Sequence, residues 1–157
     1  MHEIKTEIEI ESTPERVWSI LLNFPEHPQW NPFIRSIQGS AEKGERLTIS
    51  VQSKGGRTMT FRPTVLTATP NQELRWIGRF LLPGIIDGEH YFQILALSPG
   101  QVKFVHGEKY SGVLVRFAKS ILDREIKAGF MAMNQALKVL AESNTALGNS
   151  VVRQTVA

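Results

Sequence analysis

The fold is decided by residues 101–140, which read QVKFVHGEKYSGVLVRFAKSILDREIKAGFMAMNQALKVL. Up to Ser111 the side chains alternate with the period of a β-strand. One strand face contains Val102, Phe104, His106, Glu108 and Tyr110. After Gly112 the apolar residues recur at helical spacing: Leu114, Phe117, Ile121, Ile126, Phe130, Met133, Leu137 and Leu140. The segment therefore predicts a strand followed by one amphipathic helix of about 25 to 30 residues, long enough to cross a sheet.

Shorter elements precede this segment. Ile4, Thr6, Ile8 and Ile10 alternate with charged residues and predict a first strand. Ser12 and Glu15 have the spacing of a capping box, with a proline between them at the start of a short helix. Three prolines at positions 25, 28 and 32 then predict a connector. Residues 33–112 alternate in short strands separated by turn signals, which favours antiparallel neighbours.

This order of elements predicts the α+β class. The expected architecture is a strongly curved antiparallel β-sheet of about seven strands that grips one long C-terminal helix, with a short helical connector after the first strand. We expect one domain over residues 1–142 and a flexible tail over 143–157, because the tail is small, polar and contains glycine. Gly129 lies inside the predicted helix, where glycine is costly, so we expect a packing or ligand reason for it.

Composition limits the function classes. The chain has 157 residues, no cysteine and a net charge of +3. Disulfides and thiol chemistry are excluded, and the mild charge without a Lys or Arg run predicts no nucleic-acid partner. The N-terminus lacks the apolar run of a signal peptide, so we expect a cytoplasmic protein. The histidines at 2, 27, 90 and 106 have no recognised ligand spacing, so we expect no metal and no other cofactor.

Local motifs add a family resemblance. They are STPERVW (12–18), WNPF (30–33), FVHGEKYSG (104–112) and GFMAMNQALK (129–138). With the order of elements, they resemble the START-like (SRPBCC) superfamily of helix-grip proteins, in particular its polyketide cyclase/dehydrase and lipid-transport-like group, over residues 3–142. The resemblance implies an apolar cavity between the long helix and the sheet. It does not select an activity, because related members enclose different molecules.

The apolar faces supply candidate ligand-binding residues, which are Trp30, Phe61, Trp76, His90, Phe92, Phe104, Phe130 and Met133. Some residues on these apolar faces are polar, and a buried polar group must find a hydrogen-bond partner in the protein or in a ligand. His106, Glu108 and Tyr110 are the candidate catalytic or ligand-orienting residues. Two alternatives stay open: the aromatic residues fill a dense core, and Glu108 and Tyr110 lie at the rim, solvated or paired with Arg124.

The leading hypothesis is binding or carriage of a small hydrophobic ligand such as a lipid, a quinone or a polyketide-like molecule. The alternative is an enzyme that uses the same cavity for proton transfer in a cyclisation or dehydration, with His106 and Glu108 as base and acid and Tyr110 holding a carbonyl.

One turn is unusually apolar. It contains Leu81, Leu82, Ile85 and Ile86 around Pro83-Gly84. Exposed apolar surface of this kind marks contact sites. We interpret the turn first as a lid or rim of the cavity, then as a transient membrane contact; a homodimer contact is the third alternative.

Overall fold

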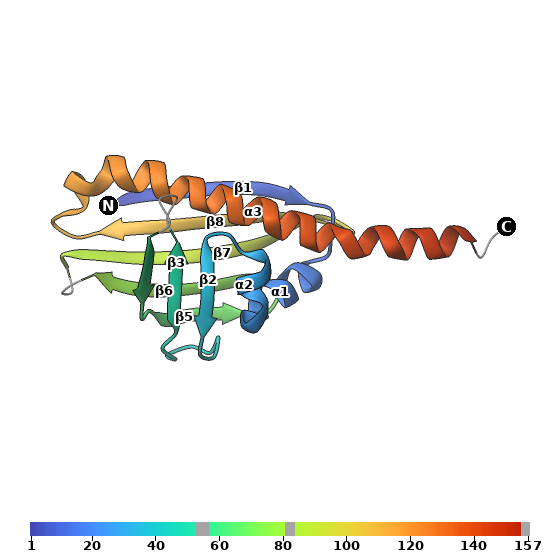
Figure 1. The fold of residues 1–157 in the computed structure, drawn as a ribbon, viewed down its shortest axis with the longest axis horizontal. Helices are drawn as coiled ribbons and strands as arrows, with labels where there is room; N and C mark the ends of the chain where they lie inside the picture. Colours follow the sequence, from blue (N-terminus) through green and yellow to red (C-terminus); the bar gives the residue numbers. More distant parts are fainter. Residues whose placement is uncertain (53–56, 81–83, 155–157) are drawn as a thin grey trace.

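The computed structural model describes residues 1–52, 57–80 and 84–154. Its elements are β1 (His2–Ile10), α1 (Pro14–Leu22), η1 (Phe24–Glu26), α2 (His27–Trp30), β2 (Ile34–Gln38), β3 (Thr48–Gln52), β4 (Thr58–Phe61), β5 (Thr64–Thr69), β6 (Glu73–Phe80), β7 (Ile86–Ser98), β8 (Gln101–Ser111) and α3 (Val115–Gln154). The short helices α1 and α2 follow β1 directly, and α3 ends the described chain (Figure 1).

Over these residues the strands form two antiparallel sheets. The larger has five strands in the order β1-β8-β7-β6-β5, and the smaller has three in the order β2-β3-β4. The strands of the smaller sheet run across β6 and β7, while α3 lies along β1 and β8 (Figure 1). The predicted α+β fold with a curved antiparallel sheet and a long helix is confirmed. The difference is that the short strands form a second sheet and bring the described strands to eight.

The helix α3 covers the inner face of the larger sheet with one apolar stripe. Phe130, Met133, Leu137 and Ala141 on this stripe are fully buried. A Cβ at Gly129 would overlap the ring of Phe33, which confirms the expected packing reason for this glycine. Lys138 Nζ donates a 2.7 Å hydrogen bond to the carbonyl of Glu9 on β1, so the helix is also tied to the sheet edge.

Two expectations about α3 need correction. The helix has 40 residues instead of about 25 to 30, because it continues past the sheet to Gln154. Leu114 and Phe117, expected on its buried face, are 43% and 70% exposed. The chain turns at Gly112 (φ 121°), and this turn presents Val115 to the core in their place. The flexible tail over 143–157 stays a prediction.

The cap of α1 also differs in detail. The hydroxyl of Thr13, instead of Ser12, accepts the backbone N–H of Arg16 at 3.2 Å, with Pro14 at the first helical position. A hydroxyl cap followed by proline is the start that the sequence indicates.

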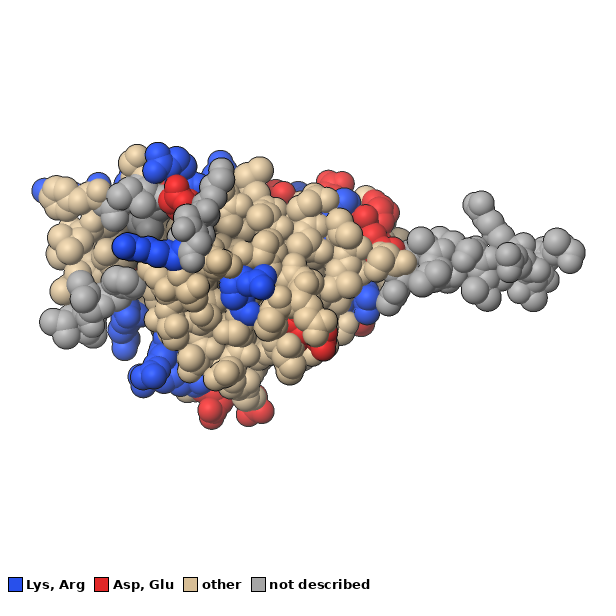
Figure 2. Space-filling view, in the orientation of Figure 1, with Lys and Arg blue, Asp and Glu red and all other residues tan. Residues whose placement is uncertain are grey.

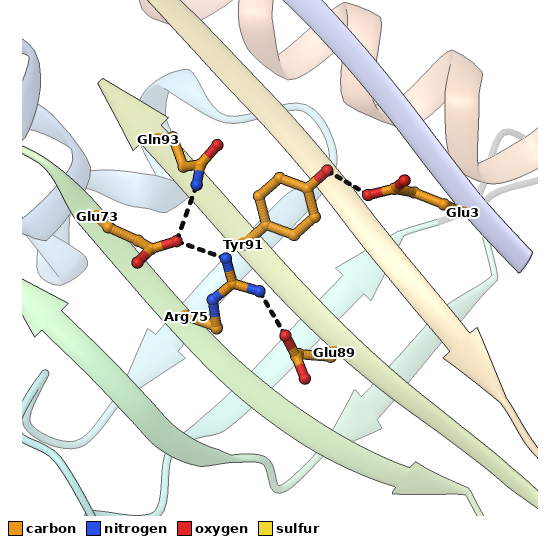
Figure 3. A network of polar contacts seen from close by, with 6 residues as sticks. All are labelled: Glu3, Glu73, Arg75, Glu89, Tyr91 and Gln93. Atoms are coloured by element: carbon orange, nitrogen blue, oxygen red, sulfur yellow. Dashed lines mark hydrogen bonds and ion pairs between the residues drawn. The ribbon is translucent and has the colours of Figure 1, made fainter. Parts of the chain in front are cut away.

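The outer face of the larger sheet carries a polar network (Figure 3). Arg75 lies between Glu73 and Glu89 and contacts both carboxylates. Its guanidinium lies over the ring of Tyr91, whose hydroxyl donates to Glu3 on β1 at 2.7 Å. Burial, with the hydrogen bond to Glu3, raises the pKa of Tyr91 above its usual range. The network joins β1, β6 and β7 on the face opposite α3, which leaves the inner face to the apolar side chains and the site.

Candidate functional site

Three rows of paired residues cross β6, β7 and β8 on the inner face of the larger sheet. The first row is Leu74, Phe92 and His106; the second is Trp76, His90 and Glu108; the third is Gly78, Gly88 and Tyr110. The alternation predicted for these strands is therefore confirmed. The third row has two glycines side by side, so the sheet presents almost no side-chain volume there.

A cavity of about 240 Å³ lies over the second and third rows. Its opposite wall is the smaller sheet, which contributes Ile34, Ile49, Val51, Met59 and Phe61. The helix α3 contributes Ile126. Met59 is 38% exposed although it lines the cavity, so the cavity opens to the surface beside β4. Figure 2 shows that the face over β2 and β3 is mainly uncharged, while Lys and Arg gather toward the end where α3 begins.

The structure divides the predicted site residues into two groups. Phe61, Trp76, His90, Glu108 and Tyr110 line the cavity. The others lie elsewhere: Phe92, Phe104, Phe130 and Met133 in the core, His106 behind His90, and Trp30 beside His27. The reason is that α3 packs directly on the first row and fills that space. The cavity is thus mainly between the two sheets, and not between helix and sheet as expected.

A buried chain of hydrogen bonds leads from the cavity wall into the core. His90 Nε2 and His106 Nε2 are 3.0 Å apart, and His106 Nδ1 is 2.9 Å from Asn134 Oδ1 on α3. Asn134 Nδ2 donates to Thr6 Oγ1 on β1 at 2.9 Å. Complete burial, then the charge of His90, lowers the pKa of His106 well below its usual value, against the opposing effect of the Asn134 bond. His106 is therefore a neutral imidazole near pH 7.

Aromatic rings hold both imidazoles in place. The His90 ring stacks on Trp76 with centroids 4.8 Å apart and planes at 6°. The His106 ring stacks on Phe130 at 3.7 Å. The predicted Phe130 thus supports the site through His106 instead of lining it.

The carboxylate of Glu108 completes the polar side of the cavity. Tyr110 donates to Glu108 Oε2 at 2.7 Å, and His90 Nδ1 is 3.5 Å from the same oxygen. Burial, then the charge of Glu108 and the hydrogen bond to it, raises the pKa of Tyr110 above its usual range, so Tyr110 keeps its proton. The suggested partner Arg124 instead is 78% exposed in its side chain and lies 3.2 Å from Glu125.

Sequence reasoning missed the role of Gly88. A Cβ at Gly88 would overlap Glu108 Oε1. The carboxylate therefore occupies the space that the side chain of any other residue at position 88 would fill. The signal was present, because Gly78 and Gly88 are strand glycines and such glycines mark a close approach or open space.

The connector supplies one edge of the cavity through a third buried histidine, His27. His27 Nε2 donates to the Leu21 carbonyl at 2.9 Å, and Asn31 Nδ2 donates to His27 Nδ1 at 3.1 Å. Asn31 Oδ1 accepts the backbone N–H groups of Phe33 and Ile34 at 3.0 and 2.9 Å. The WNPF motif therefore fixes the turn that brings Phe33 and Ile34 to the cavity.

Across 1–52, 57–80 and 84–154 no group of three His, Asp or Glu side chains is placed to hold a metal ion. Over the same ranges, no helix combines the length and the apolar character needed to span a membrane.

A curved antiparallel sheet closed by a long helix around a partly open apolar cavity defines the START helix-grip class of protein. The chain belongs to the family described as polyketide cyclase / dehydrase and lipid transport, whose model matches residues 1–142. No curated protein matches the sequence.

Solved structures share the fold at low sequence identity. A START superfamily protein from Mycobacterium smegmatis is 19% identical with a TM-score of 0.72, over 90% of this chain and 98% of that one. The Zhui aromatase/cyclase from Streptomyces sp. R1128 is 11% identical with a TM-score of 0.74, over 92% and 95%. The di-domain ARO/CYC StfQ from the steffimycin biosynthetic pathway is 13% identical with a TM-score of 0.71, over 92% and 52%. At these identities the similarity concerns the fold.

Proposed function

We propose that this protein binds a small hydrophobic molecule in the cavity between its two sheets. The observation that carries the proposal is the apolar hollow of about 240 Å³ over Gly78 and Gly88, with His90, Glu108 and Tyr110 on one wall. Ligand pockets are mostly apolar with a few converging polar groups, and span about 300–1,000 Å³. The cavity lies just below that range, so a compact ligand fits better than a long-chain lipid. The lipid-transport part of the family description supports the same role.

The apolar turn at 81–86 contributes to this proposal in part. Ile86 lines the cavity, which supports a lid or rim role. Leu81 and Leu82 lie outside the described residues. Membrane contact and homodimer contact through this turn stay predictions, as does the cytoplasmic location.

The test is to block the cavity from a position that tolerates a side chain. A Cβ at Gly78 would meet nothing closer than 3.9 Å, so Gly78→Phe directs a ring into the hollow without a backbone clash. Calorimetric titration with 1-naphthol, a compact two-ring compound, should show binding to the wild type and at least a tenfold loss in Gly78→Phe.

The matched control is Leu95→Phe, because Leu95 also lies in the larger sheet, is 47% exposed and does not line the cavity. It should bind 1-naphthol like the wild type. Equal affinities in the wild type and Gly78→Phe would show that the cavity is not the binding site.

A second candidate function is proton-transfer catalysis, favoured by the contact of an imidazole and a carboxylate on the cavity wall. Glu108 is the candidate base, and His90 replaces His106 as its histidine partner, because His90 Nδ1 lies beside the carboxylate and His106 lies behind His90. The test is exchange of the α-protons of 1-tetralone in D₂O, followed by NMR. Exchange that is faster than in buffer and is lost in Glu108→Gln would support catalysis; a rate equal to that of buffer would leave binding alone.

A further inference from the structure

The hydroxyl of Thr6 fixes the direction of the whole buried chain. It has one proton, which it donates to the carbonyl of His106 at 3.2 Å. Thr6 Oγ1 must therefore accept from its other neighbour, so Asn134 presents its amide nitrogen to Thr6 and its oxygen to His106. His106 consequently carries its proton on Nδ1. Because it is neutral, its Nε2 is an acceptor.

The direction of the hydrogen bonds is fixed as far as the cavity wall. His106 Nε2 accepts, so His90 donates from its own Nε2, 3.0 Å away. This proton of His90 points into the core and is not offered to a ligand. The other ring nitrogen of His90, Nδ1, faces Glu108. A proton on Nδ1 would lie between Nδ1 and Glu108 Oε2, so it is not offered to a ligand either.

The remaining hydrogen-bonding capacity of this cluster is that of an acceptor. Tyr110 uses its proton on Glu108 Oε2, which leaves Oε1 over Gly88 at the cavity wall. A carboxylate oxygen accepts about two hydrogen bonds. Arg79 also lines the cavity; because it follows Gly78 on β6, strand alternation predicts that its side chain is directed away from the face that carries Glu108.

We propose that the natural ligand is an apolar molecule that carries a hydroxyl group, and that this hydroxyl donates a hydrogen bond to Glu108 Oε1. The inference rests on the proposed binding function and adds the chemical class of the ligand. An acceptor-only ligand, such as an ether, would leave Oε1 desolvated and unpaired, which is unfavourable for a charged group.

The test compares two ligands that differ in the donor alone. In calorimetric titrations, 1-naphthol should bind about tenfold more tightly than 1-methoxynaphthalene, as expected for one hydrogen bond to a charged acceptor. Glu108→Gln should remove this preference, because Tyr110 holds the amide oxygen and the amide NH₂ then faces the cavity. Gly88→Ala should reduce the preference too, because its Cβ displaces Oε1.

The direction of the chain is tested separately by ¹⁵N NMR of the imidazoles. We expect the proton of His106 on Nδ1 and a proton of His90 on Nε2 in the wild type. Thr6→Ser, which keeps the hydroxyl, should show the same tautomers. Thr6→Val, which lacks the hydroxyl, should show a smaller fraction of them. The opposite tautomers in the wild type would overturn the inference.

The titrations separate the two proposals. Equal affinities for the two naphthalenes, each lowered by Gly78→Phe, would overturn the hydroxyl preference and retain the binding site. If neither compound binds, or if Gly78→Phe affects neither, both proposals are overturned.

Discussion

Acidification should destabilise the protein before its carboxylates titrate, because His106 and His27, two of the three buried histidines, resist protonation in the folded state. Burial is the main cause of the lowered pKa of both His106 and His27. The unfolded chain takes up these protons near pH 6.5 and the folded protein does not. The contribution of the two neutral histidines to the free energy of unfolding is therefore fully present above pH 6.5 and is lost as the pH falls toward the folded pKa values.

The size of the effect follows from this linkage. A histidine with an unfolded pKa of about 6.5 that stays neutral in the folded state lowers the free energy of unfolding by about 1 kcal/mol between pH 7 and pH 5.5. His106 and His27 each contribute up to this amount, so the wild type should lose about 1 to 3 kcal/mol. Glu7 and Glu142, whose pKa values are lowered, act only at a pH below this window.

The assay is urea unfolding at the two pH values. His106→Gln keeps hydrogen-bonding groups but does not titrate, and should reduce the loss by up to about 1 kcal/mol. His27→Gln should also reduce the loss, independently of His106→Gln. The reasoning is refuted if the wild type is equally stable at both pH values, or if His106→Gln shows the full wild-type loss.

Three further substitutions test the packing around the site. Asn134→Leu leaves the Nδ1 proton of His106 unpaired and should lower the free energy of unfolding by about 1–3 kcal/mol in urea, whereas a change below about 0.5 kcal/mol would contradict the buried chain. Gly129→Ala should lower the melting temperature. Overlap of the new Cβ with Phe33 costs about 1–3 kcal/mol, while the higher helix propensity of alanine stabilises by about 1 kcal/mol. A higher melting temperature would contradict the contact with Phe33. Gly78→Phe should raise the melting temperature, because a strand glycine costs about 0.5–1 kcal/mol and the ring enters empty space; a clear decrease would mean that the space is filled.

The elements that local periodicity controls could be predicted from the sequence. Alternation along 102–110 placed His106, Glu108 and Tyr110 on one strand face, and the register confirms it. The change to helical spacing after Gly112 predicted α3, and Gly129 was correctly singled out. Each of these features depends on neighbours within one element.

The position of the cavity could not be predicted in the same way. It depends on how β2, β3 and β4 cross the larger sheet, which is a long-range arrangement that alternation does not encode. Phe92 and Phe104 do lie on the inner face, but α3 covers their rows, so they became core residues. Asn134 was present in a quoted motif, yet its role depends on contacts with β1 and β8, distant in sequence.

The central claim is that the space over Gly78 and Gly88 receives an apolar ligand. Its most direct test is the set of intermolecular NOEs between 1-naphthol and the methyl groups of isotope-labelled protein. The account predicts NOEs to Ile49 and Val51, which line the cavity from the smaller sheet, and to Ile126, which lines it from α3. NOEs confined to exposed methyl groups such as those of Leu95 and Val113 would contradict it.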